Sequence, residues 1–477
     1  MYSLYNAESC GNIGSVVVQY DEEPLTMNPE VFREYDVRGL VEKDLTYEFV
    51  RNLGKAVGTL GIDRGVKTMT VGRDCRLSSK NYRDALIEGL VSAGIDVIDI
   101  GLAATPMLYF SIQHLGADGG VMITGSHNPP DFNGFKICIG IDTIYGDEIQ
   151  HLQTIIERGA YASGQGKVTV QSIVDPYHEC IFRSVSIARP LHIAVDGGNG
   201  VGGFFSLPLF ERFGCPAVPI YCEMDGRFPN HFPDPTIEDN LDDLIRVVKE
   251  KHCDFGIAFD GDADRIGVVT SGGRIVRGDE LLLLFSRAIL KKNPGATIIG
   301  EVKCSRVLYD DITRHGGRPI MWKAGHSLIK GKMREEKALL AGEMSGHLFF
   351  ADRYFGYDDA IYAAARLLEI VSHSNNGIEG FLSDIPVTFS TPEIRIDCPD
   401  HVKFGVVEEV KDFFRRGYKI NDIDGVRIEF SDGWGLVRAS NTQPVLVLRF
   451  ESTSEEGLAR IRKLIEEVLH TTMTHSV

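Results

Sequence analysis

The sequence predicts an α/β protein of four domains, in which three related α/β units are followed by a C-terminal α+β domain. The chain of 477 residues is long enough for about three domains of ~150 residues, or for four smaller ones. One order of strands and helices occurs three times along the chain, and the final segment follows a different pattern. We therefore expect domains at residues 1–171, 172–274, 275–386 and 387–477.

Composition supports a globular protein and excludes several classes. Hydrophobic residues make up 43% of the chain and charged residues 25%, which excludes disordered, collagen-like and coiled-coil proteins. No run reaches the ~18 apolar residues of a membrane helix, and no basic segment precedes an apolar one at the N-terminus. The nine cysteines are scattered, with no C-x-x-C pair. We therefore expect reduced thiols, no membrane span, no signal peptide and a cytoplasmic location.

The charge of the chain limits its partners. The sequence has 50 Lys and Arg against 67 Asp and Glu, which gives a formal net charge of −17 at pH 7. Nucleic acids and anionic membranes bind basic surfaces, so neither is an expected partner. A small anionic ligand would need a local cationic pocket within this acidic envelope.

The repeated unit consists of a strand, a helix, a second strand after a glycine, a second helix, and a third strand that ends in a polar loop. The first strands are expected at 68–72, 192–196 and 297–301, the second at 95–101, 215–222 and 318–322, and the third at 120–124, 255–260 and 338–342. Strands that alternate with helices indicate parallel sheets covered on both faces, with ligand loops at the carboxyl ends of the strands. The three loops after the third strands form one cleft if the domains pack with these ends together.

The last domain has a different pattern. A helix is expected over 402–414, and strands over 427–430, 436–438 and 445–450. Asp432-Gly433 predicts a hairpin turn, and Thr453 with Glu456 predicts a capping box for a final helix. The apolar stripe of that helix is Leu458, Ile461, Leu464, Ile465, Val468 and Leu469.

The loop D-G-D-A-D-R (260–265) indicates a metal site. Asp260, Asp262 and Asp264 alternate directly after an apolar strand, and clustered carboxylates repel one another unless a cation neutralises them. Ligands that are all oxygen suit Mg²⁺. Arg265 adds a cation that would favour a phosphate. A solvated acidic turn is the less favoured interpretation.

The loop T-G-S-H-N-P-P (124–130) holds a candidate nucleophile. Ser126 lies beside His127 in a segment stiffened by two prolines, and Lys136 follows as a possible counter-charge. A serine in an Asn-Pro turn is an equally good interpretation of the spacing alone. The loop lacks the G-x-S-x-G pattern, which disfavours serine-hydrolase chemistry.

Two further loops carry polar groups suited to a sugar phosphate. G-E-M-S-G-H (342–347) presents Glu343, Ser345 and His347, which are able to bind the hydroxyls of a polyol. R-A-S-N-T (438–442) presents a guanidinium, hydroxyls and an amide, a set of donors typical of phosphate binding or of a hydrogen-bonded turn. K-A-G-H (323–326) adds His326, which in isolation is more often structural.

One motif favours a different class of enzyme. Gly198-x-Gly200-x-x-Gly203 follows a strand, and Glu223 lies about 20 residues further on, as in a dinucleotide-binding fingerprint. This supports an NAD-dependent oxidoreductase as an alternative. Asp196 and Asn199 crowd the turn, and the motif is unconnected to the Asp and Ser loops, so the alternative is the weaker hypothesis.

Taken together, the loops resemble those of the α-D-phosphohexomutase family, in the family's order along nearly the whole chain. F-R-E-Y-D-V-R-G (32–39) is similar to its opening motif, although Glu34 takes a position often held by a smaller residue. The other four loops resemble the family's phosphoserine, magnesium, sugar-binding and phosphate-binding loops. The resemblance implies three related α/β domains with mixed or parallel sheets, and a C-terminal domain similar to the TATA-box-binding-protein fold.

The resemblance also implies a reaction and roles. The family moves a phosphoryl group between C1 and C6 of a hexose phosphate through a phosphoserine and a hexose 1,6-bisphosphate, with Mg²⁺. It implies that Ser126, Asp260, Asp262 and Asp264 hold the metal, and that Lys136 and His326 act as acid and base. The catalytic set it implies is Ser126, His127, Lys136, Arg265, His326 and Arg38. The substrate-binding set it implies is Tyr35, Lys303, Gly325, Glu343, Ser345, His347, Arg438, Ser440, Asn441 and Thr442.

The substrate depends on one residue of the sugar-binding loop. Met344 resembles phosphomannomutase/phosphoglucomutase members, whereas phosphoglucosamine mutases usually have Gln there. Mannose or glucose phosphate is therefore the expected substrate, glucosamine phosphate is the alternative, and glucose or mannose 1,6-bisphosphate is the expected activator. A sugar-phosphate sensor without activity is disfavoured, because binding alone needs no nucleophile beside a metal. The expected assembly is a monomer or a small homo-oligomer.

Overall fold

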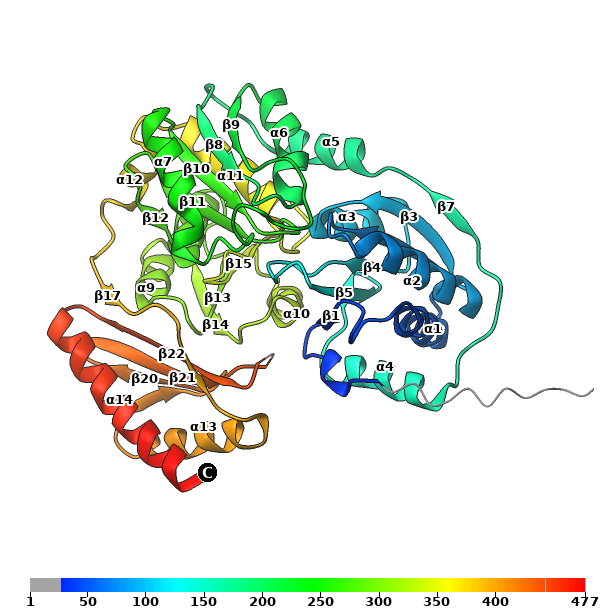
Figure 1. Cartoon of the computed structure of the whole chain (residues 1–477). Coiled ribbons are helices and arrows are strands. Elements are labelled where there is room, and N and C mark those ends of the chain that lie inside the picture. Colours follow the sequence, from blue (N-terminus) through cyan, green and yellow to red (C-terminus); the bar gives the residue numbers. More distant parts are fainter. Residues whose placement is uncertain (1–26, 442, 477) are drawn as a thin grey trace, which may run out of the picture.

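The computed structural model describes residues 27–441 and 443–476 and contains four sheets, which follow one another along the chain (Figure 1). The predicted site residue Thr442 lies outside the described residues, as does the N-terminal segment 1–26. In the part that the structure describes, no helix is long and apolar enough to cross a membrane. The domain boundaries at residues 171, 274 and 386 stay predictions.

The first domain is built on a sheet in the order β1-β5-β4-β2-β3-β7, with β6 paired to β5. β2, β3 and β4 are parallel, and β5 runs antiparallel to β4. The strands are β1 Val37–Leu40, β2 Thr68–Arg73, β3 Asp96–Leu102, β4 Gly119–Ile123, β5 Phe132–Ile139, β6 Asp142–Thr143 and β7 Val168–Val170. The helices are η1 Pro29–Val31, α1 Tyr47–Asp63, α2 Ser79–Ala93, α3 Thr105–Leu115 and α4 Asp147–Arg158, and α5 Val174–Ser184 follows β7 within the expected second domain.

The second domain repeats this arrangement on a sheet in the order β12-β11-β10-β8-β9. β8 is central and parallel to both β9 and β10, and β11 returns antiparallel to β10. The strands are β8 Ile193–Asp196, β9 Ala217–Ile220, β10 Phe255–Phe259, β11 Ile266–Thr270 and β12 Ile275–Val276. The helices are α6 Val201–Arg212, η2 Glu238–Leu241 and α7 Asp242–Glu250.

The third domain has the same core in the order β14-β13-β15-β16. β13 is parallel to β14 and β15, and β16 returns antiparallel to β15. The strands are β13 Thr297–Glu301, β14 Arg318–Trp322, β15 Leu340–Gly342 and β16 Leu348–Phe350. The helices are α8 Gly278–Leu290, α9 Arg306–Arg314, α10 His326–Glu336, α11 Ala360–Ser372 and α12 Gly377–Leu382.

The three parallel strands expected in each repeat are present, with the first strand in the middle. Each repeat also has a fourth strand, β5, β11 or β16, which makes the sheets mixed. Each polar loop therefore joins a parallel strand to its antiparallel neighbour in the same sheet. The apolar core is continuous across the first three domains and includes residues of α3, α6, α8 and α11.

The C-terminal domain is α+β, as expected, with the sheet order β17-β22-β21-β20-β19 and β18 paired to β22. Its likeness to the TATA-box-binding-protein fold stays a prediction. Helices α13 and α14 pack against the sheet through an apolar core of their own (Figure 1). The elements are β17 Phe389–Ser390, β18 Ile394–Asp397, α13 Asp400–Arg415, β19 Lys419–Asn421, β20 Val426–Phe430, β21 Gly433–Ala439, β22 Val445–Ser452 and α14 Glu455–Ser476.

Two local predictions in this domain are wrong by one residue. Phe430 pairs with Gly433, so the hairpin turn consists of Ser431 and Asp432, and Gly433 already belongs to β21. α14 begins at Glu455, and the hydroxyl of Ser454 accepts the backbone N–H of Gly457 at 3.0 Å. Ser454 therefore takes the capping position that the sequence pattern assigned to Thr453.

Candidate active site

Loops from three sheets meet at the candidate active site. The loops follow β4, β10 and β15, and each leads into the antiparallel strand of its own sheet. Ser126 of the first loop donates to Asp260 of the second at 2.9 Å, and Arg265 Nε of the second donates to His347 of the third at 3.0 Å. The arrangement expected from the repeats is therefore present, with the ends of the three third strands close together.

Ser126 is held in an uncommon backbone conformation. Its φ is 48°, in the left-handed region, where a residue with a Cβ pays roughly 1–2 kcal/mol. Its backbone N–H donates to the Thr124 hydroxyl at 2.8 Å, and its own Oγ lies 3.1 Å from His127 Nδ1. The side chain is almost fully buried, so the hydroxyl faces the second domain instead of open solvent.

The carboxylates of Asp260, Asp262 and Asp264 form one buried cluster. All three residues are 0% exposed, and one ligand atom of each lies within 4.8 Å of the others. Among the described residues, one buried carboxylate oxygen each of Asp262 and Asp264 has no hydrogen-bond partner. Burial, together with the charges of the other two, raises the pKa of Asp260 well above its usual range. Unpaired oxygens and mutual repulsion are features that a bound divalent cation would relieve, so the cluster fits a metal ion.

The glycine of the metal loop is required by the approach of the serine loop. A Cβ at Gly261 would lie 2.3 Å from the backbone carbonyl oxygen of Ser126 and 3.3 Å from Pro233. α3 closes the other side, because the Thr105 hydroxyl donates to Asp262 Oδ2 at 2.5 Å and the Thr105 backbone N–H donates to the Asp262 carbonyl. The metal loop is thus fixed by contacts with the first domain.

Lys136 reaches the acidic cluster from β5. Its ammonium lies 2.9 Å from Asp262 and also bonds Asp264. Burial by itself would lower the pKa of Lys136, but the two carboxylates outweigh burial and raise it. The same ammonium holds the pKa of Asp262 well below its usual range, against the effect of burial. Lys136 is therefore a fixed positive charge beside Ser126.

Asp358 links the two histidines of the site, and sequence reasoning did not find it. Its Oδ2 lies 3.1 Å from His347 Nδ1 and 3.9 Å from His326 Nδ1, and its Oδ1 lies 3.4 Å from Lys330 Nζ. The residue is 0% exposed, directly before the N-cap of α11. The stretch F-G-Y-D-D (355–359) matches no motif, so only the position of a carboxylate before a buried helix could have signalled it.

The contacts of His347 fix its tautomer. The Nε–H of Arg265 can only donate, so His347 Nε2 accepts, and the remaining proton lies on Nδ1 and faces Asp358. Burial lowers the pKa of His347, but the carboxylates of Asp264 and Asp358 raise it more. For His326, burial and the charge of Lys330 lower the pKa well below its usual range, so this ring is neutral.

The last domain also contributes residues to the site, and they lie beside Tyr35 of the first domain. Tyr35 donates to the Ala324 carbonyl at 3.0 Å and accepts from the amide of Asn441 at 2.9 Å. Arg438 is nearly buried and donates to Asp424 at 3.0 Å. The K-A-G-H loop and the loop expected to bind phosphate are thus linked to the opening motif of the first domain.

The other predicted residues lie around this centre. Glu343 accepts the backbone N–H of Gly325 at 2.7 Å, and a Cβ at Gly325 would lie 2.6 Å from the Tyr35 ring. Arg38 donates to Asn128 of the serine loop at 2.8 Å, and Lys303 lies 3.2 Å from Glu393. Ser440 is buried and Ser345 is half-buried.

The glycine motif 198–203 has a structural role. A Cβ at Gly200 would lie 2.7 Å from the Gly261 carbonyl oxygen, and a Cβ at Gly203 would lie 2.6 Å from Cys222 Sγ. The Asn199 amide donates to the Glu223 carbonyl at 2.9 Å, so chain segments cover the end of the strand where a dinucleotide would bind. The motif allows the metal loop to pack closely, and the oxidoreductase alternative is not favoured.

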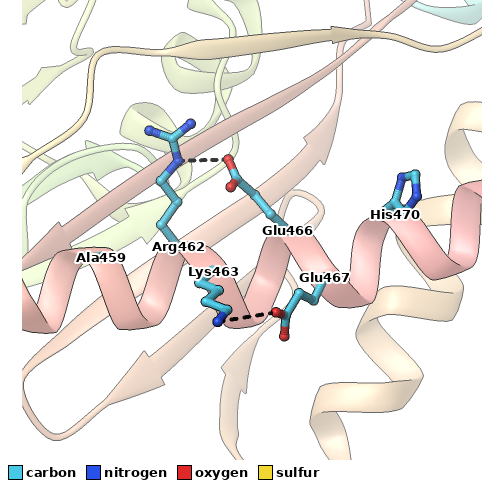
Figure 2. Close-up of a pocket in the computed structure, with 6 residues that line it drawn as sticks. All are labelled: Ala459, Arg462, Lys463, Glu466, Glu467 and His470. Atoms are coloured by element: carbon cyan, nitrogen blue, oxygen red, sulfur yellow. Dashed lines mark hydrogen bonds and ion pairs between the residues drawn. The ribbon is translucent and has the colours of Figure 1, made fainter.

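The outer face of α14 carries a shallow depression with no reactive grouping (Figure 2). Arg462 pairs with Glu466 at 2.8 Å and Lys463 with Glu467 at 3.8 Å, each four residues apart on the helix. Such exposed pairs add little to stability. This surface is solvated helix, remote from the cluster of loops.

Models of four domains of one family match the chain in order. The alpha/beta/alpha domains I, II and III of phosphoglucomutase/phosphomannomutase match residues 29–162, 174–273 and 277–389, and the C-terminal domain matches residues 393–468.

Individual proteins agree with these matches. The chain is 49% identical over 445 residues to a phosphomannomutase/phosphoglucomutase of Pseudomonas aeruginosa, covering 93% of this chain and 96% of the relative. It is 46% identical to a phosphoglucomutase of Neisseria gonorrhoeae, with 92% and 96% covered. A crystal structure of a phosphoglucomutase/phosphomannomutase family protein from Burkholderia thailandensis superposes with a TM-score of 0.90 at 41% identity, covering 94% of this chain and 99% of that one.

Proposed function

Because the chain belongs to the phosphoglucomutase/phosphomannomutase family, we propose that it catalyses reversible phosphoryl transfer between C1 and C6 of a hexose phosphate. Mannose and glucose phosphates are the proposed substrates, as the names of the most similar relatives suggest. One observation carries the proposal: the hydroxyl of Ser126 points into a buried carboxylate cluster, 2.9 Å from Asp260. A nucleophile aimed at a candidate metal site is the arrangement that phosphoryl transfer needs.

The reaction proceeds in two transfers. Ser126 begins as a phosphoserine, and a free hydroxyl of the hexose phosphate attacks its phosphorus. The bond between phosphorus and Ser126 Oγ breaks as the new P–O bond forms, which gives a hexose 1,6-bisphosphate and a free serine. The bisphosphate then presents its other phosphoryl group to Ser126, and the reverse transfer regenerates the phosphoserine and releases the isomeric hexose phosphate. The same bisphosphate, added from solution, would phosphorylate a resting enzyme.

Asp260, Asp262, Asp264 and an oxygen of the phosphorylated Ser126 would hold Mg²⁺, the hard divalent cation that suits an all-oxygen set. The bound ion supplies charge neutralisation at the transferred phosphoryl group. Arg265 and Lys136 add fixed positive charge on the protein side, and His127 lies 3.1 Å from the serine oxygen. Arg38 orients the serine loop through Asn128.

A proton must leave the attacking hydroxyl and return to the serine oxygen. Lys136 and His326 are the residues implied by the family resemblance. Lys136 is held as an ammonium by Asp262 and Asp264, so it has no lone pair to accept a proton, and of the two roles only that of donor is open to it. The neutral ring of His326 suits the role of base.

The remaining loops bind the sugar and its second phosphate. Glu343 and Ser345 would bind the hydroxyls of the sugar. Gly325, which has no side chain, lets the backbone pass close to the ring of Tyr35. The phosphate that is not reacting would be bound by Arg438, Ser440, Asn441 and Thr442, with Lys303 nearby. Donors on a separate domain support this role, because they can align a phosphate at a distance from Ser126.

We further propose a cytoplasmic monomer or small homo-oligomer that binds neither nucleic acid nor membranes. The eight cysteines in the described residues are free, which supports the cytoplasmic location. The net charge of −17 supports the absence of nucleic-acid and membrane binding.

Turnover of the α-1-phosphates of mannose, glucose and glucosamine to their 6-phosphates tests the proposal. The assay contains Mg²⁺ and catalytic glucose 1,6-bisphosphate, with Ser126→Ala alongside the wild type. We expect mannose and glucose phosphates to react and the variant to be inactive. Full activity of Ser126→Ala would refute the covalent mechanism, and an inactive wild type would refute the mutase function.

A further inference from the structure

Arg76 lies directly beneath the serine loop, on the short segment between β2 and α2. Its side chain is 0% exposed. Its guanidinium donates to four backbone carbonyls of the loop: Nη2 to Ser126 at 2.8 Å and Asn128 at 2.6 Å, and Nη1 to Pro129 at 2.6 Å and Phe132 at 2.9 Å. The loop that carries the nucleophile is therefore closed around one buried cation.

Asp74 completes the arrangement from the same segment. Its Oδ2 lies 3.2 Å from Arg76 Nε and accepts the backbone N–H of Gly125 at 3.3 Å, and its Oδ1 accepts the N–H of Arg76 and the hydroxyl of Ser79. A Cβ at Gly125 would lie 2.5 Å from Arg76 Cζ, so the loop can approach the guanidinium only with glycine there. Both sides of Ser126 are thus tied to the residue pair Asp74 and Arg76.

The second domain covers the other face of this pair. The ring of Phe228 lies 4.9 Å from Arg76 Cζ, and a Cβ at Gly226 would lie 2.6 Å from the Cys75 carbonyl oxygen. Arg76 therefore occupies the seam between the serine loop and the domain that carries the metal loop.

The four bonds also show what Arg76 does not do. Its two Nη atoms carry four hydrogens, and each hydrogen has a carbonyl partner in the loop. None of these donors remains for a substrate phosphate, which distinguishes Arg76 from Arg265 and Arg438. Its role is to fix backbone, and the backbone it fixes includes the left-handed Ser126.

We propose that Arg76 is a positioning residue for phosphoryl transfer, which holds Ser126 in the left-handed conformation that directs its oxygen toward Asp260. The inference rests on the proposed function of Ser126. A lysine in this place would keep the charge, but its ammonium has only three N–H donors on one nitrogen, whereas the planar guanidinium bonds four carbonyls. The positive charge alone is thus not enough to hold the loop, and the experiments test the geometry of the guanidinium.

The first experiment compares Arg76→Lys with Arg83→Lys. Arg83 lies on α2 and pairs with Asp99 and Asp84, away from the serine loop, so it is a matched control. We expect Arg76→Lys to lower kcat by about 100-fold with KM unchanged, since a small displacement of a reacting atom has an effect of this order. Arg83→Lys should leave both constants unchanged. A wild-type kcat in Arg76→Lys, or a raised KM with unchanged kcat, would overturn the proposal.

A second experiment separates positioning from general damage and does not need Arg76→Lys to fold. Arg76→Ala is assayed with and without guanidinium ion at low millimolar concentration, which can fill the space left by the side chain. We expect partial recovery of kcat and of the rate at which glucose 1,6-bisphosphate phosphorylates Ser126, followed by intact mass. The ion should not restore activity to Ser126→Ala, and it should leave the activity of Arg83→Ala unchanged. Absence of rescue in a variant that melts like the wild type would contradict the proposal.

The wild type, assayed in parallel, shows whether a negative result bears on the role of Arg76 or on the proposed function of the whole protein. An active wild type with unaffected Arg76 variants refutes the positioning role alone. A wild type that turns over none of the hexose phosphates refutes the proposed function, and the role of Arg76 falls with it.

Discussion

Asp358 sits between two imidazoles and an ammonium, and this position defines its effect on the reaction. Its carboxylate faces His347 Nδ1 at 3.1 Å, and Nε2 of the same ring accepts from Arg265. It also lies 3.9 Å from Nδ1 of His326, the proposed base, and partly neutralises Lys330, whose ammonium lies 4.0 Å from the centre of the Tyr109 ring. One buried carboxylate thus sets the tautomer of His347 and the charge around His326.

Replacing Asp358 by asparagine should lower kcat and leave KM nearly unchanged. The amide has no charge to face the proposed base His326, and it permits the other tautomer of His347; loss of a general base lowers rates by about 10²–10⁴-fold. Steady-state kinetics with mannose 1-phosphate measures the effect. Asp311→Asn is the matched control, because Asp311 is an equally buried carboxylate paired with Arg287 at 2.6 Å on α9. Equal losses in the two variants would contradict a specific role of Asp358.

The environment of the neighbouring residue, Asp359, should make the free energy of unfolding depend on pH. Its buried carboxylate accepts from Tyr177, Tyr354 and the N–H of Tyr362, with no cation among these donors. Burial raises its pKa from 3.8 to about 7. A folded pKa above the unfolded value means that the folded state binds the proton more tightly, so the contribution of this carboxyl group to stability is greatest below pH 4 and is lost as the pH rises to 7.

The test of this prediction is the free energy of unfolding at pH 5 and pH 8. We expect the wild type to lose about 2.7 kcal/mol relative to Asp359→Asn between these two pH values, because the group titrates over about two pH units from 5 to 7 and one unit corresponds to about 1.4 kcal/mol. The comparison between the two proteins cancels the other titrating groups. Parallel pH profiles for the wild type and the variant would show that the carboxylate does not titrate in this range.

At the scale of elements, the first, second and third strands of each repeat were predictable, but the fourth was not. Short apolar runs mark the parallel strands, and in each repeat a glycine precedes the second of them. β5 carries Asn133, Gly134 and Lys136, and β16 has only three residues, so neither has the pattern of a strand. The reactive loops were therefore predicted as ends of strands, whereas they are connections between two strands of one sheet.

The site was predictable where it is carried by short runs of polar residues. Ser126, the three aspartates of the metal loop and Glu343 lie in such runs. Asp358 lies outside them, and Arg76 lies in the polar run R-D-C-R (73–76) at the end of β2. What makes both residues important is contact with residues distant in the chain. Pairing at long range leaves no periodic signal in a single sequence, so sequence reasoning could not have found them.

The loop after β21 should govern substrate affinity more than turnover. Arg438→Ala removes a nearly buried guanidinium from the proposed phosphate clamp, and a hydrogen bond to a charged group contributes about 1.5–3 kcal/mol. We expect KM to rise by about 10- to 100-fold. Arg415→Ala, on the exposed face of α13, is the control. A fall in kcat with unchanged KM would place Arg438 in the chemical step instead.

At the scale of the whole molecule, the metal loop is the junction of three domains. Thr105 of the first domain bonds Asp262, and the N–H of Ala360 from the third domain donates to the Ala263 carbonyl. The last domain is attached to the third by Arg427, which donates to the carbonyls of Val302 and Cys304 at 2.7 Å each. A change at the junction therefore reaches all the domains.

Magnesium should consequently stabilise the folded protein. A ligand at 100 times its dissociation constant adds about 2.7 kcal/mol to the free energy of unfolding. We expect the melting temperature to rise with added MgCl₂ and not with KCl of the same ionic strength. Asp260→Asn, which leaves both carboxylate partners of Lys136 in place, should lose most of the rise. An equal rise in this variant would show that the ion binds elsewhere.

The connection of each reactive loop to two neighbouring strands has a mechanical consequence. β4 and β5, β10 and β11, and β15 and β16 are hydrogen-bonded pairs, so each loop is anchored at both ends and has the stiffness of a hairpin. Each loop therefore moves only together with its own sheet. The bisphosphate of the proposed reaction has to turn end over end between the two transfers, and because this turning is a diffusive motion, the viscosity of the surrounding water acts on it directly.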